Sequence, residues 1–219
     1  MRDEDPPLTP RLLLQAYRAG VFPMSESRDD PNVFWVDPQM RGIFPLKGFH
    51  TSKSLKKRLR RGHFSATANT AFRDVVAGCA DRPETWINST IFDLYLHLHQ
   101  MGYAHSVEVW DGEELIGGVY GVALGAAFFG ESMFSRKTDA SKAALFFLVD
   151  RLNSQRFHLF DTQFITPHLR SLGAMEIQRS DYHLQLDMAL EKMATFGCAG
   201  PLPSAQEVLQ RSAHTSYRG

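Results

Sequence analysis

The sequence predicts an α+β fold in which a small N-terminal domain packs on a larger domain with a mixed, mostly antiparallel sheet. Three observations indicate this fold class. The chain has 219 residues, 43% of them apolar, so it can bury a sizeable core. Three strand-like segments follow one another between residues 105 and 134, with helix-like segments before and after them. Residues 21–49 are instead rich in proline, glycine and aromatic residues, which disfavours long helices there.

The small N-terminal domain is expected to span residues 1–49 and to begin with a helix. Thr9 is a good N-cap residue, Pro10 suits the first helical position, and Gly20 is a typical helix stop. The prolines and glycines that follow predict short strands and ordered loops up to residue 49.

The larger domain is expected to span residues 50–195 and to start with helices. Leu55 and Leu59 are four residues apart, as on one face of a helix. Asparagine is a favoured N-cap residue and glycine a frequent stop. In order, we expect a helix at 52–61, a strand at about 63–68, a helix capped by Asn69 and a helix from Asn88 to Gly102.

Three strands form the centre of this domain. Residues 105–110 alternate between apolar and polar, and Asp111-Gly112 is a hairpin signal that leads into strands at 114–124 and 126–134. The expected elements after them are a helix from Asp139 to about Arg156, a buried strand at 158–163, a short helix from Thr166 to Gly173, and a strand or helix at 182–190. Residues 196–219 are expected to be a polar, flexible tail. This order is similar to that of the N-acetyltransferases (the GNAT fold), an analogy at the level of the fold.

The composition limits the classes of function. The chain carries 24 basic and 24 acidic residues, so any contact with a nucleic acid must come from a local patch. Two cysteines, Cys79 and Cys198, make neither a disulfide framework nor a four-ligand zinc site. His97 and His99 point to different sides of their helix, so we expect no metal site. No apolar run reaches ~18 residues, and the N-terminus does not resemble a signal peptide, so a cytoplasmic protein is expected.

One segment is strongly basic. No acidic residue occurs between Asp37 and Asp74, and six cations fall within nine residues. On a helix they would occupy most of the surface that Leu55 and Leu59 leave free. Such a surface attracts a phosphate backbone without reading its bases, although a solvated helix face is the simpler alternative. The six cations are Lys53, Lys56, Lys57, Arg58, Arg60 and Arg61.

Three polar residues stand in strongly apolar surroundings. Glu131 lies between Phe128-Phe129 and Met133-Phe134, where a carboxylate is costly unless it is paired or has a task. Asp161 and Gln163 are two residues apart at the end of an apolar strand, so their side chains point to the same sheet face. The alternatives are an ion pair between Glu131 and Arg136 or Lys137, and a strand-end hydrogen bond for Asp161.

Taken together, these segments resemble the bacterial leucyl/phenylalanyl-tRNA–protein transferase family. The resemblance runs in order from about Leu12 to Leu190. Its matching stretches are residues 13–23 (LLQAYRAGVFP), 34–38 (FWVDP), 50–54 (HTSKS), 84–88 (ETWIN), 102–108 (GYAHSVE), 118–121 (GVYG), 130–135 (GESMFS) and 161–163 (DTQ).

The resemblance implies a GNAT-type catalytic domain that uses no metal or coenzyme. It implies transfer of Leu, Phe or Met from aminoacyl-tRNA to proteins that begin with Arg or Lys, which marks them for degradation. By similarity, Asp161, Gln163 and Glu131 would lie at the reaction centre, with Asp161 accepting a proton from the acceptor amine or orienting it, and the six cations would hold the tRNA acceptor arm. The aminoacyl side chain and terminal adenosine would contact Trp35, Trp86, Val119, Phe128 and Met133.

Two alternatives stay open from the sequence. One is an acetyl-CoA-dependent N-acetyltransferase, although the turn at residues 135–142 lacks the glycines that usually hold the pyrophosphate of coenzyme A. The other is a non-catalytic RNA-binding module, which would need the basic helix but has no use for Glu131, Asp161 and Gln163 together.

Overall fold

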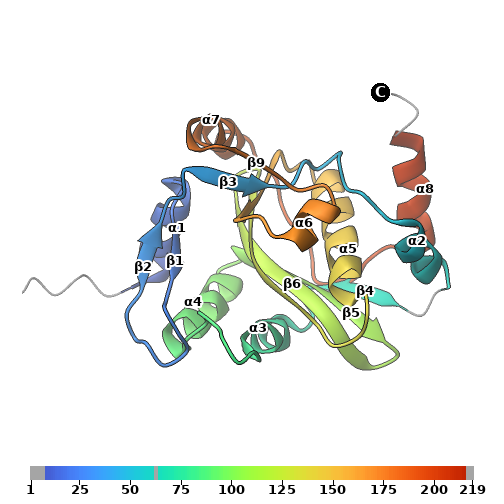
Figure 1. Ribbon diagram of the computed structural model, residues 1–219, viewed down its shortest axis with the longest axis horizontal. Helices are drawn as coiled ribbons and strands as arrows, with labels where there is room; N and C mark the ends of the chain where they lie inside the picture. The colour runs from blue at the N-terminus through green and yellow to red at the C-terminus, as the bar shows by residue number, and fades with distance from the viewer. Residues whose placement is uncertain (1–7, 62–63, 216–219) are drawn as a thin grey trace, which may run out of the picture.

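The computed structural model describes residues 8–61 and 64–215, and it is an α+β fold with a mixed sheet (Figure 1). The helices are α1 (Pro10–Arg18), α2 (Lys53–Arg60), α3 (Phe72–Ala80), α4 (Ser89–Gln100), α5 (Ala140–Ser154), α6 (Pro167–Ser171), α7 (Arg179–Leu190) and α8 (Ala205–Thr215). The strands are β1 (Phe22–Met24), β2 (Phe34–Val36), β3 (Met40–Ile43), β4 (Ser65–Ala68), β5 (Ala104–Asp111), β6 (Glu114–Leu124), β7 (Ala127–Ser135), β8 (Leu159–Gln163), β9 (Met175–Gln178) and β10 (Gly200–Pro201).

Eight of these strands form one sheet in the order β10-β4-β5-β6-β7-β8-β3-β9, and β1 and β2 form a separate hairpin. Neighbouring strands in the sheet are antiparallel except for β7 and β8, which are parallel. The mixed, mostly antiparallel sheet predicted from the sequence is therefore confirmed. The sheet includes β3 from within the first 49 residues, and the domain boundary expected after residue 49 stays a prediction.

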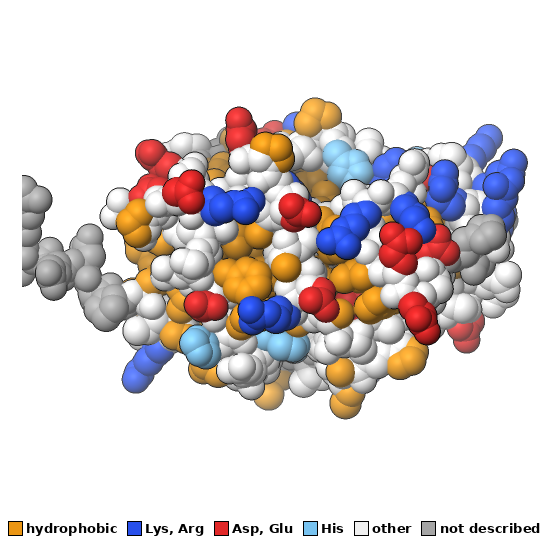
Figure 2. All heavy atoms as spheres, turned by 90° about the horizontal axis from the view of Figure 1, so that it is seen from below, with side chains coloured by type: hydrophobic (Ala, Val, Ile, Leu, Met, Phe, Trp, Pro, Cys, Tyr) orange, Lys and Arg blue, Asp and Glu red, His pale blue; other side chains and the backbone are white. Residues whose placement is uncertain are grey.

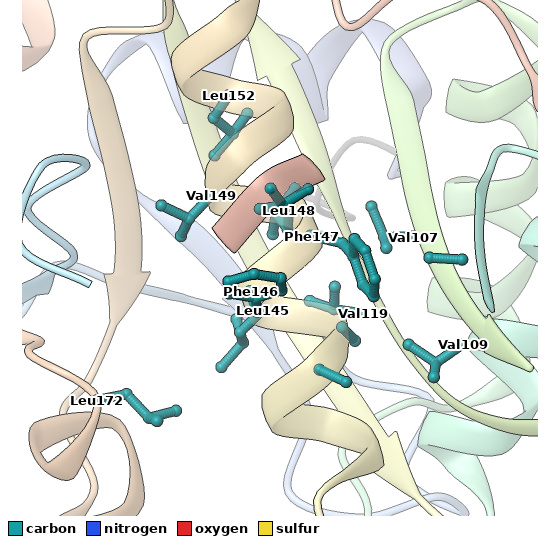
Figure 3. Packing of buried hydrophobic residues seen from close by; sticks show 14 of the residues in the cluster. Val107, Val109, Val119, Leu145, Phe146, Phe147, Leu148, Val149, Leu152 and Leu172 are labelled. Atoms are coloured by element: carbon teal, nitrogen blue, oxygen red, sulfur yellow. The ribbon is translucent and has the colours of Figure 1, made fainter. Parts of the chain in front are cut away.

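Helices cover both faces of the sheet, because alternate strand residues supply two apolar cores. In β7, Phe128 points to the core formed with α2, α5 and α8, whereas Phe129 points to the core formed with α1, α3, α4 and α7. Helix α5 runs along the first face and presents a dense set of side chains to β5 and β6 (Figure 3). We call these the α5 core and the α1 core.

Local sequence signals place most elements as predicted. Thr9, Ser52, Asn88 and Thr166 each accept a hydrogen bond from a backbone N–H in the first turn of their helix, at 2.8–3.2 Å. Gly42 allows β3 to approach β8 closely, since a Cβ there would lie 2.8 Å from the backbone of Phe164.

The cap predicted at Asn69 is wrong, and Asp139 begins α5 as expected but makes no side-chain hydrogen bond to the helix backbone. Asn69 lies in a left-handed turn (φ 57°) before α3 and accepts from the backbone N–H of Ser106 instead of capping the helix. Asp139 precedes α5 with φ 68° and turns its carboxylate toward Arg58 and Lys142 instead of the helix. In both cases a partner from another element, the Ser106 backbone of β5 or Arg58 of α2, takes up the side chain instead.

The C-terminal part differs most from the sequence prediction. The segment at 182–190 is helix α7, and the short strand β9 before it was missed because its alternation of apolar and polar residues covers only four, largely exposed, positions. The tail expected to be flexible contains β10 and α8. Ala205 and Val208 of α8 are buried in the α5 core and Leu209 packs against it, so a few apolar residues fix a helix that is mostly polar.

Candidate active site

The three predicted polar residues meet where strands β7 and β8 part. The parallel ladder joins Ala127 to Leu159 and ends with Phe129 and Asp161. Glu131 and Gln163 lie two residues further along their strands, and Gln163 Nε2 donates to Glu131 Oε1 at 3.1 Å. A side-chain hydrogen bond thus continues the contact between the two strands beyond the last backbone pair.

Glu131 is 9% exposed and has no cationic partner within hydrogen-bonding distance in the described residues. Tyr17 of α1 donates to Oε1 at 2.7 Å, and Tyr95 of α4 donates to Oε2 at 2.6 Å. Together with Gln163, three neutral donors hold this carboxylate. The alternative ion pair with Arg136 or Lys137 is excluded, because Glu131 points into the α1 core and Lys137 pairs with Asp111 and Glu114.

The ionisation of Glu131 is tuned by these surroundings. Burial raises the pKa of Glu131 from 4.5 to about 7, and the donors Tyr95, Tyr17 and Gln163 act in the opposite direction because they stabilise the charged form. The pKa values of both tyrosines are raised above the usual value by burial and by the nearby carboxylate. Glu131 is therefore poised to gain or lose charge near neutral pH.

Asp161 is fully buried and forms an ion pair with Arg41 of β3. Arg41 Nε donates to Oδ1 at 3.0 Å, and Nη2 donates to Oδ2 at 2.6 Å. Tyr182 of α7 adds a third bond to Oδ2 at 2.8 Å, and the backbone N–H of Gln163 adds a fourth to Oδ1 at 2.7 Å. A carboxylate offers about four acceptor positions, so Asp161 has none to spare for a substrate proton unless one of these bonds opens.

The bond from Asp161 to the Gln163 backbone holds an unusual conformation. Gln163 has φ 63°, a left-handed value that is uncommon outside glycine. Strain of this kind persists only where surrounding groups fix it, and it is frequent at active sites. The turn directs the Gln163 side-chain amide toward Glu131. The backbone conformation of Gln163 therefore determines the hydrogen bond between Gln163 and Glu131.

The five residues expected to form the aminoacyl and adenosine pocket lie in separate places. Val119 and Phe128 are buried in the α5 core, and Met133 packs against it opposite Val119 across β6 and β7. Trp35 on β2 is 40% exposed, and Trp86 packs against the α1 core in the segment before α4. Among the described residues, no hydrogen bond or ring contact joins either tryptophan to Glu131 or Gln163. The structure thus groups Val119, Phe128 and Met133 in the α5 core and places Trp86 against the α1 core.

The basic segment forms helix α2 as predicted. Leu55 and Leu59 are buried in the α5 core, and all six cations are exposed. Lysine and arginine side chains gather at the end of the molecule that carries α2 (Figure 2). Within the described residues, Arg58 is the only one of the six in an ion pair, with Asp139 at 3.1 Å. The helix therefore presents a mostly uncompensated basic surface.

Membrane spans and metal clusters are both absent from the described part of the chain. No helix there is long and apolar enough to cross a membrane. No group of three or more His, Cys, Asp or Glu side chains there is arranged to hold a metal ion, and the expectation that the protein uses no metal stays a prediction.

Comparison with known proteins assigns the family. Residues 43–187 match the family model described as leucyl/phenylalanyl-tRNA protein transferase, and residues 7–39 match the N-terminal domain of the same family. The chain belongs to the leucyl/phenylalanyl-tRNA protein transferase family. The resemblance found in the sequence is thereby confirmed.

Curated transferases of this family match almost the full length of the chain. A leucyl/phenylalanyl-tRNA–protein transferase of Cereibacter sphaeroides is 62% identical over 96% of this chain and 99% of the relative. Relatives with the same name from Ruegeria sp. (strain TM1040) and Jannaschia sp. (strain CCS1) are 61% and 58% identical, over 95% and 87% of this chain and 99% and 90% of their own lengths.

We call the buried side chains around Glu131, Asp161 and Gln163 the polar centre. Sequence reasoning missed four of its residues. Tyr17, Tyr95 and Tyr182 are interior positions of helices, where a tyrosine is usually only a core residue. Arg41 lies in the segment without acidic residues between Asp37 and Asp74, but unlike the six cations of α2 it is only 1% exposed. One signal was available, because a cation beside Gly42-Ile43-Phe44 and a carboxylate on the apolar strand β8 each need an opposite charge.

Proposed function

We propose that this protein transfers Leu, and also Phe or Met, from aminoacyl-tRNA to the α-amino group of proteins that begin with Arg or Lys, as a signal for degradation. Family membership and the names of relatives up to 62% identical support the reaction class. Aminoacyl-tRNA is a cytoplasmic substrate, so the proposal also places the protein in the cytoplasm.

The observation that carries the proposal is the hydrogen bond between Glu131 and Gln163 beyond the end of the β7–β8 ladder. Glu131 is an anionic group that attracts a cationic acceptor end, and its two tyrosine donors fix its position. Gln163 uses its Nε2 on Glu131, and no described residue donates to its Oε1. We assign to Oε1 the task of accepting a hydrogen bond from the attacking amine.

The reaction needs alignment more than chemical activation. The ester that links the amino acid to tRNA is already activated, and the α-amine has a pKa of about 8, so a useful fraction is neutral at pH 7. The amine nitrogen forms a bond to the ester carbonyl carbon, the bond from this carbon to the ribose oxygen breaks, and the proton lost by the amine balances the one that the ribose hydroxyl gains. Holding the two reactants in line accounts for a large part of the rate, with no covalent intermediate.

Asp161 is assigned a supporting role in this scheme. Its four hydrogen bonds fill the carboxylate, so direct proton transfer to Asp161 would require the pair with Arg41 or the bond from Tyr182 to open. The bond to the Gln163 backbone lets Asp161 act through Gln163 instead. Of the two roles expected from the sequence, orientation therefore fits the geometry better than base catalysis.

Val119, Phe128 and Met133 are proposed to receive the aminoacyl side chain, with Trp35 and Trp86 near the terminal adenosine. Discrimination between apolar side chains that differ by a methylene group is worth only about 1–3 kcal/mol, so several apolar amino acids should be accepted. Charged side chains would be excluded by the cost of removing them from water.

Helix α2 is proposed to hold the tRNA acceptor arm through phosphates, since its cations are exposed and, among the described residues, only Arg58 has an acidic partner. A GNAT-type arrangement is proposed for the sheet, supported by the parallel strands β7 and β8 that part at the candidate centre.

An acetyl-CoA substrate is disfavoured. Asp139 places a carboxylate where α5 begins, which would repel a phosphate, and Ser135 Oγ already accepts from the Ser141 N–H.

The direct test is transfer of radiolabelled leucine from Leu-tRNA to a peptide that begins with Arg. A peptide beginning with Ala and a reaction with free leucine serve as controls. We expect label on the Arg peptide alone and only from charged tRNA. Bound tRNA without labelled peptide would instead support a non-catalytic RNA-binding protein, and acetyl transfer from acetyl-CoA would support the other alternative.

A further inference from the structure

Arg41 is a buried cation with an unusually complete set of partners. Its side chain is 1% exposed, and two of its nitrogens donate to Asp161 at 3.0 and 2.6 Å. Nη1 donates to the backbone carbonyl of Gly20 at 2.9 Å, and Nη2 also reaches the hydroxyl of Tyr182 at 3.2 Å. The guanidinium lies over the rings of Phe22 and Tyr182, 4.6 and 4.4 Å from their centroids. One side chain thus ties together the end of α1, strands β1 and β8, and helix α7.

The first path from Arg41 leads through Asp161 to Gln163. Arg41 fixes both carboxylate oxygens of Asp161, and Oδ1 then accepts the backbone N–H of Gln163 at 2.7 Å. This bond supports the left-handed conformation of Gln163, whose side chain donates to Glu131 Oε1.

The second path leads through the end of α1. The Gly20 carbonyl accepts from Arg41, and the Gly20 N–H donates to the Tyr17 carbonyl at 3.0 Å. The Tyr17 hydroxyl then donates to the same Oε1 of Glu131 at 2.7 Å. Both described donors to Oε1, Gln163 and Tyr17, are therefore connected to Arg41 by hydrogen bonds. The two paths start at Arg41 and meet at Glu131.

Stability alone is a weak reason for this arrangement. A buried ion pair gains little over apolar residues of similar size, because removing both charges from water offsets most of their attraction. A guanidinium fork does supply fixed directions, which an apolar side chain or a lysine cannot match. The value of Arg41 lies in the geometry that it imposes.

We infer that Arg41 is a positioning residue of the transfer centre: through Asp161 it sets Gln163, through Gly20 it sets Tyr17, and together these fix the carboxylate of Glu131. The inference rests on the proposed function for its effect on turnover. Arg41 does not touch substrate in this scheme, and it acts only through the residues around it.

The test compares Arg41→Met and Arg41→Lys with Arg151→Met. Arg151 is a suitable control because, like Arg41, it donates to backbone carbonyls (those of Phe196 and Cys198) and lies over an aromatic ring (Phe196), but this ring belongs to the α5 core, on the other face of the sheet from Tyr17 and Tyr95. For Arg41→Met we expect kcat to fall about 100-fold, with KM for Leu-tRNA changed less than about threefold, since a shift near 1 Å at a reaction centre costs about this much. Arg41→Lys keeps the charge and should still fold, but it loses the fork, so a fall of about tenfold is expected.

A second measurement keeps the inference separate from the proposed function. The titration of the Glu131 carboxyl can be followed by carbon-13 NMR on glutamate-labelled protein, with Glu131→Gln to assign the signal. Weaker donors to Oε1 raise the pKa of Glu131, so its midpoint should move upward from about 7 in Arg41→Lys and stay in place in Arg151→Met. An unchanged midpoint in folded Arg41→Lys, or equal kinetic losses in Arg41→Lys and Arg151→Met, would overturn the inference. Failure of the wild type to transfer leucine, with the midpoint shifted as expected, would overturn only the proposed function.

Discussion

The polar centre and helix α2 use charge in opposite ways. In the centre, Arg41 and Asp161 are almost fully buried, and each oxygen of Asp161 and Glu131 accepts at least one described donor. On α2, six cations are exposed, and Arg58 is the one with an ion pair in the described part of the chain. In the centre, hydrogen bonds fix the orientation of the side chains. On α2, the cations supply positive charge, but apart from Arg58 their side chains are free to move.

This difference separates the two tasks of the proposed reaction. Transfer between an amine and an ester needs atoms placed within fractions of an ångström, and such placement requires buried, mutually supporting hydrogen bonds. Attraction of a tRNA phosphate backbone needs only positive charge near the surface, and mobile side chains suffice for it. Changes in the centre should therefore alter turnover steeply, and changes on α2 should alter tRNA affinity in graded, salt-dependent steps.

The largest effect is expected from Gln163→Ala. This change removes the side-chain donor to Glu131 and the amide oxygen proposed to meet the acceptor amine. Loss of one oriented hydrogen-bonding group at a reaction centre typically costs 10²–10³ in kcat, about 3–4 kcal/mol. Single-turnover rates at saturating Leu-tRNA measure this step.

Asp161→Ala removes the carboxylate that holds the Gln163 backbone and neutralises Arg41, so it should affect both turnover and stability. It should reduce kcat by a similar factor through Gln163 and leave Arg41 buried without its partner, so stability should fall as well. Thermal unfolding of both variants is the control, and only Asp161→Ala should lose several degrees. Equal losses of turnover and tRNA affinity in either variant would contradict the separation of the two regions.

The two regions also differ in how well the sequence predicted them. Helix α2 was predicted with its buried leucines and its exposed cations, because both are encoded within ten consecutive residues. The order of strands β4 to β8 and the mixed sheet followed from local patterns of the same kind. The strand patterns marked Glu131, Asp161 and Gln163 as candidates, and the resemblance to the transferase family predicted that they lie together.

The supporting residues of the centre were missed because their partners are remote in the sequence. Arg41 and Asp161 are 120 positions apart, and Tyr17 and Glu131 are 114 positions apart. The periodic pattern of apolar residues within a helix or strand carries no information about such a remote pairing.

Helix α8 was missed for a related reason: its sequence is mostly polar, and it is fixed by burial of Ala205 and Val208 against residues of α2 and α5. Sequence patterns therefore located the chemistry but not the scaffold that orients it.

A smaller effect than that of Gln163→Ala or Asp161→Ala is expected from removing four cations of α2 together, as Lys53, Lys56, Lys57 and Arg60 to Ala. These side chains are exposed and lack described ion pairs, so the fold should tolerate the change. The affinity for tRNA should fall about 10- to 100-fold, and the slope of log affinity against log salt should become shallower by about 3, since each phosphate that is no longer neutralised accounts for about 0.7–0.9. A filter-binding titration at several salt concentrations measures both quantities.

Turnover at saturating tRNA provides the control for the α2 variant. We expect kcat within about threefold of the wild type, because the centre is untouched. A salt slope that does not change would remove α2 from the tRNA interface. A large loss of kcat at saturation would show that charge on α2 also sets the geometry of the centre.

A pH profile sharpens the comparison within the centre itself. The pKa of Glu131 is raised to about 7, so the carboxylate that attracts the acceptor forms as pH rises through this value. The acceptor amine titrates in both proteins, so the useful quantity is the ratio of kcat/KM between wild type and Glu131→Gln. This ratio should rise about tenfold between pH 6 and pH 8. A flat ratio would mean that the charge of Glu131 is not used.

Stability gives an independent check on the same group, with the opposite sign. The folded state retains the Glu131 proton between pH 4.5 and about 7, where the unfolded state has lost it. The contribution of this group to stability is therefore greatest below pH 4.5 and decreases as pH rises toward 7. The free energy of unfolding of Glu131→Gln relative to wild type should increase across that range.

The smallest effect is expected where the two regions meet, at the ion pair between Arg58 of α2 and Asp139 at the start of α5. Asp139→Asn would release Arg58 and Lys142 for phosphate contacts, and an ion pair at the surface is worth at most about 1 kcal/mol. The affinity for tRNA should rise by no more than about threefold, with kcat unchanged. Repeating the change in an Arg58→Ala background isolates the pair, since most of the gain should then disappear. If Asp139→Asn lowers kcat instead, the start of α5 takes part in positioning the reacting groups. The region that sets turnover then extends from the polar centre to the residues next to α2.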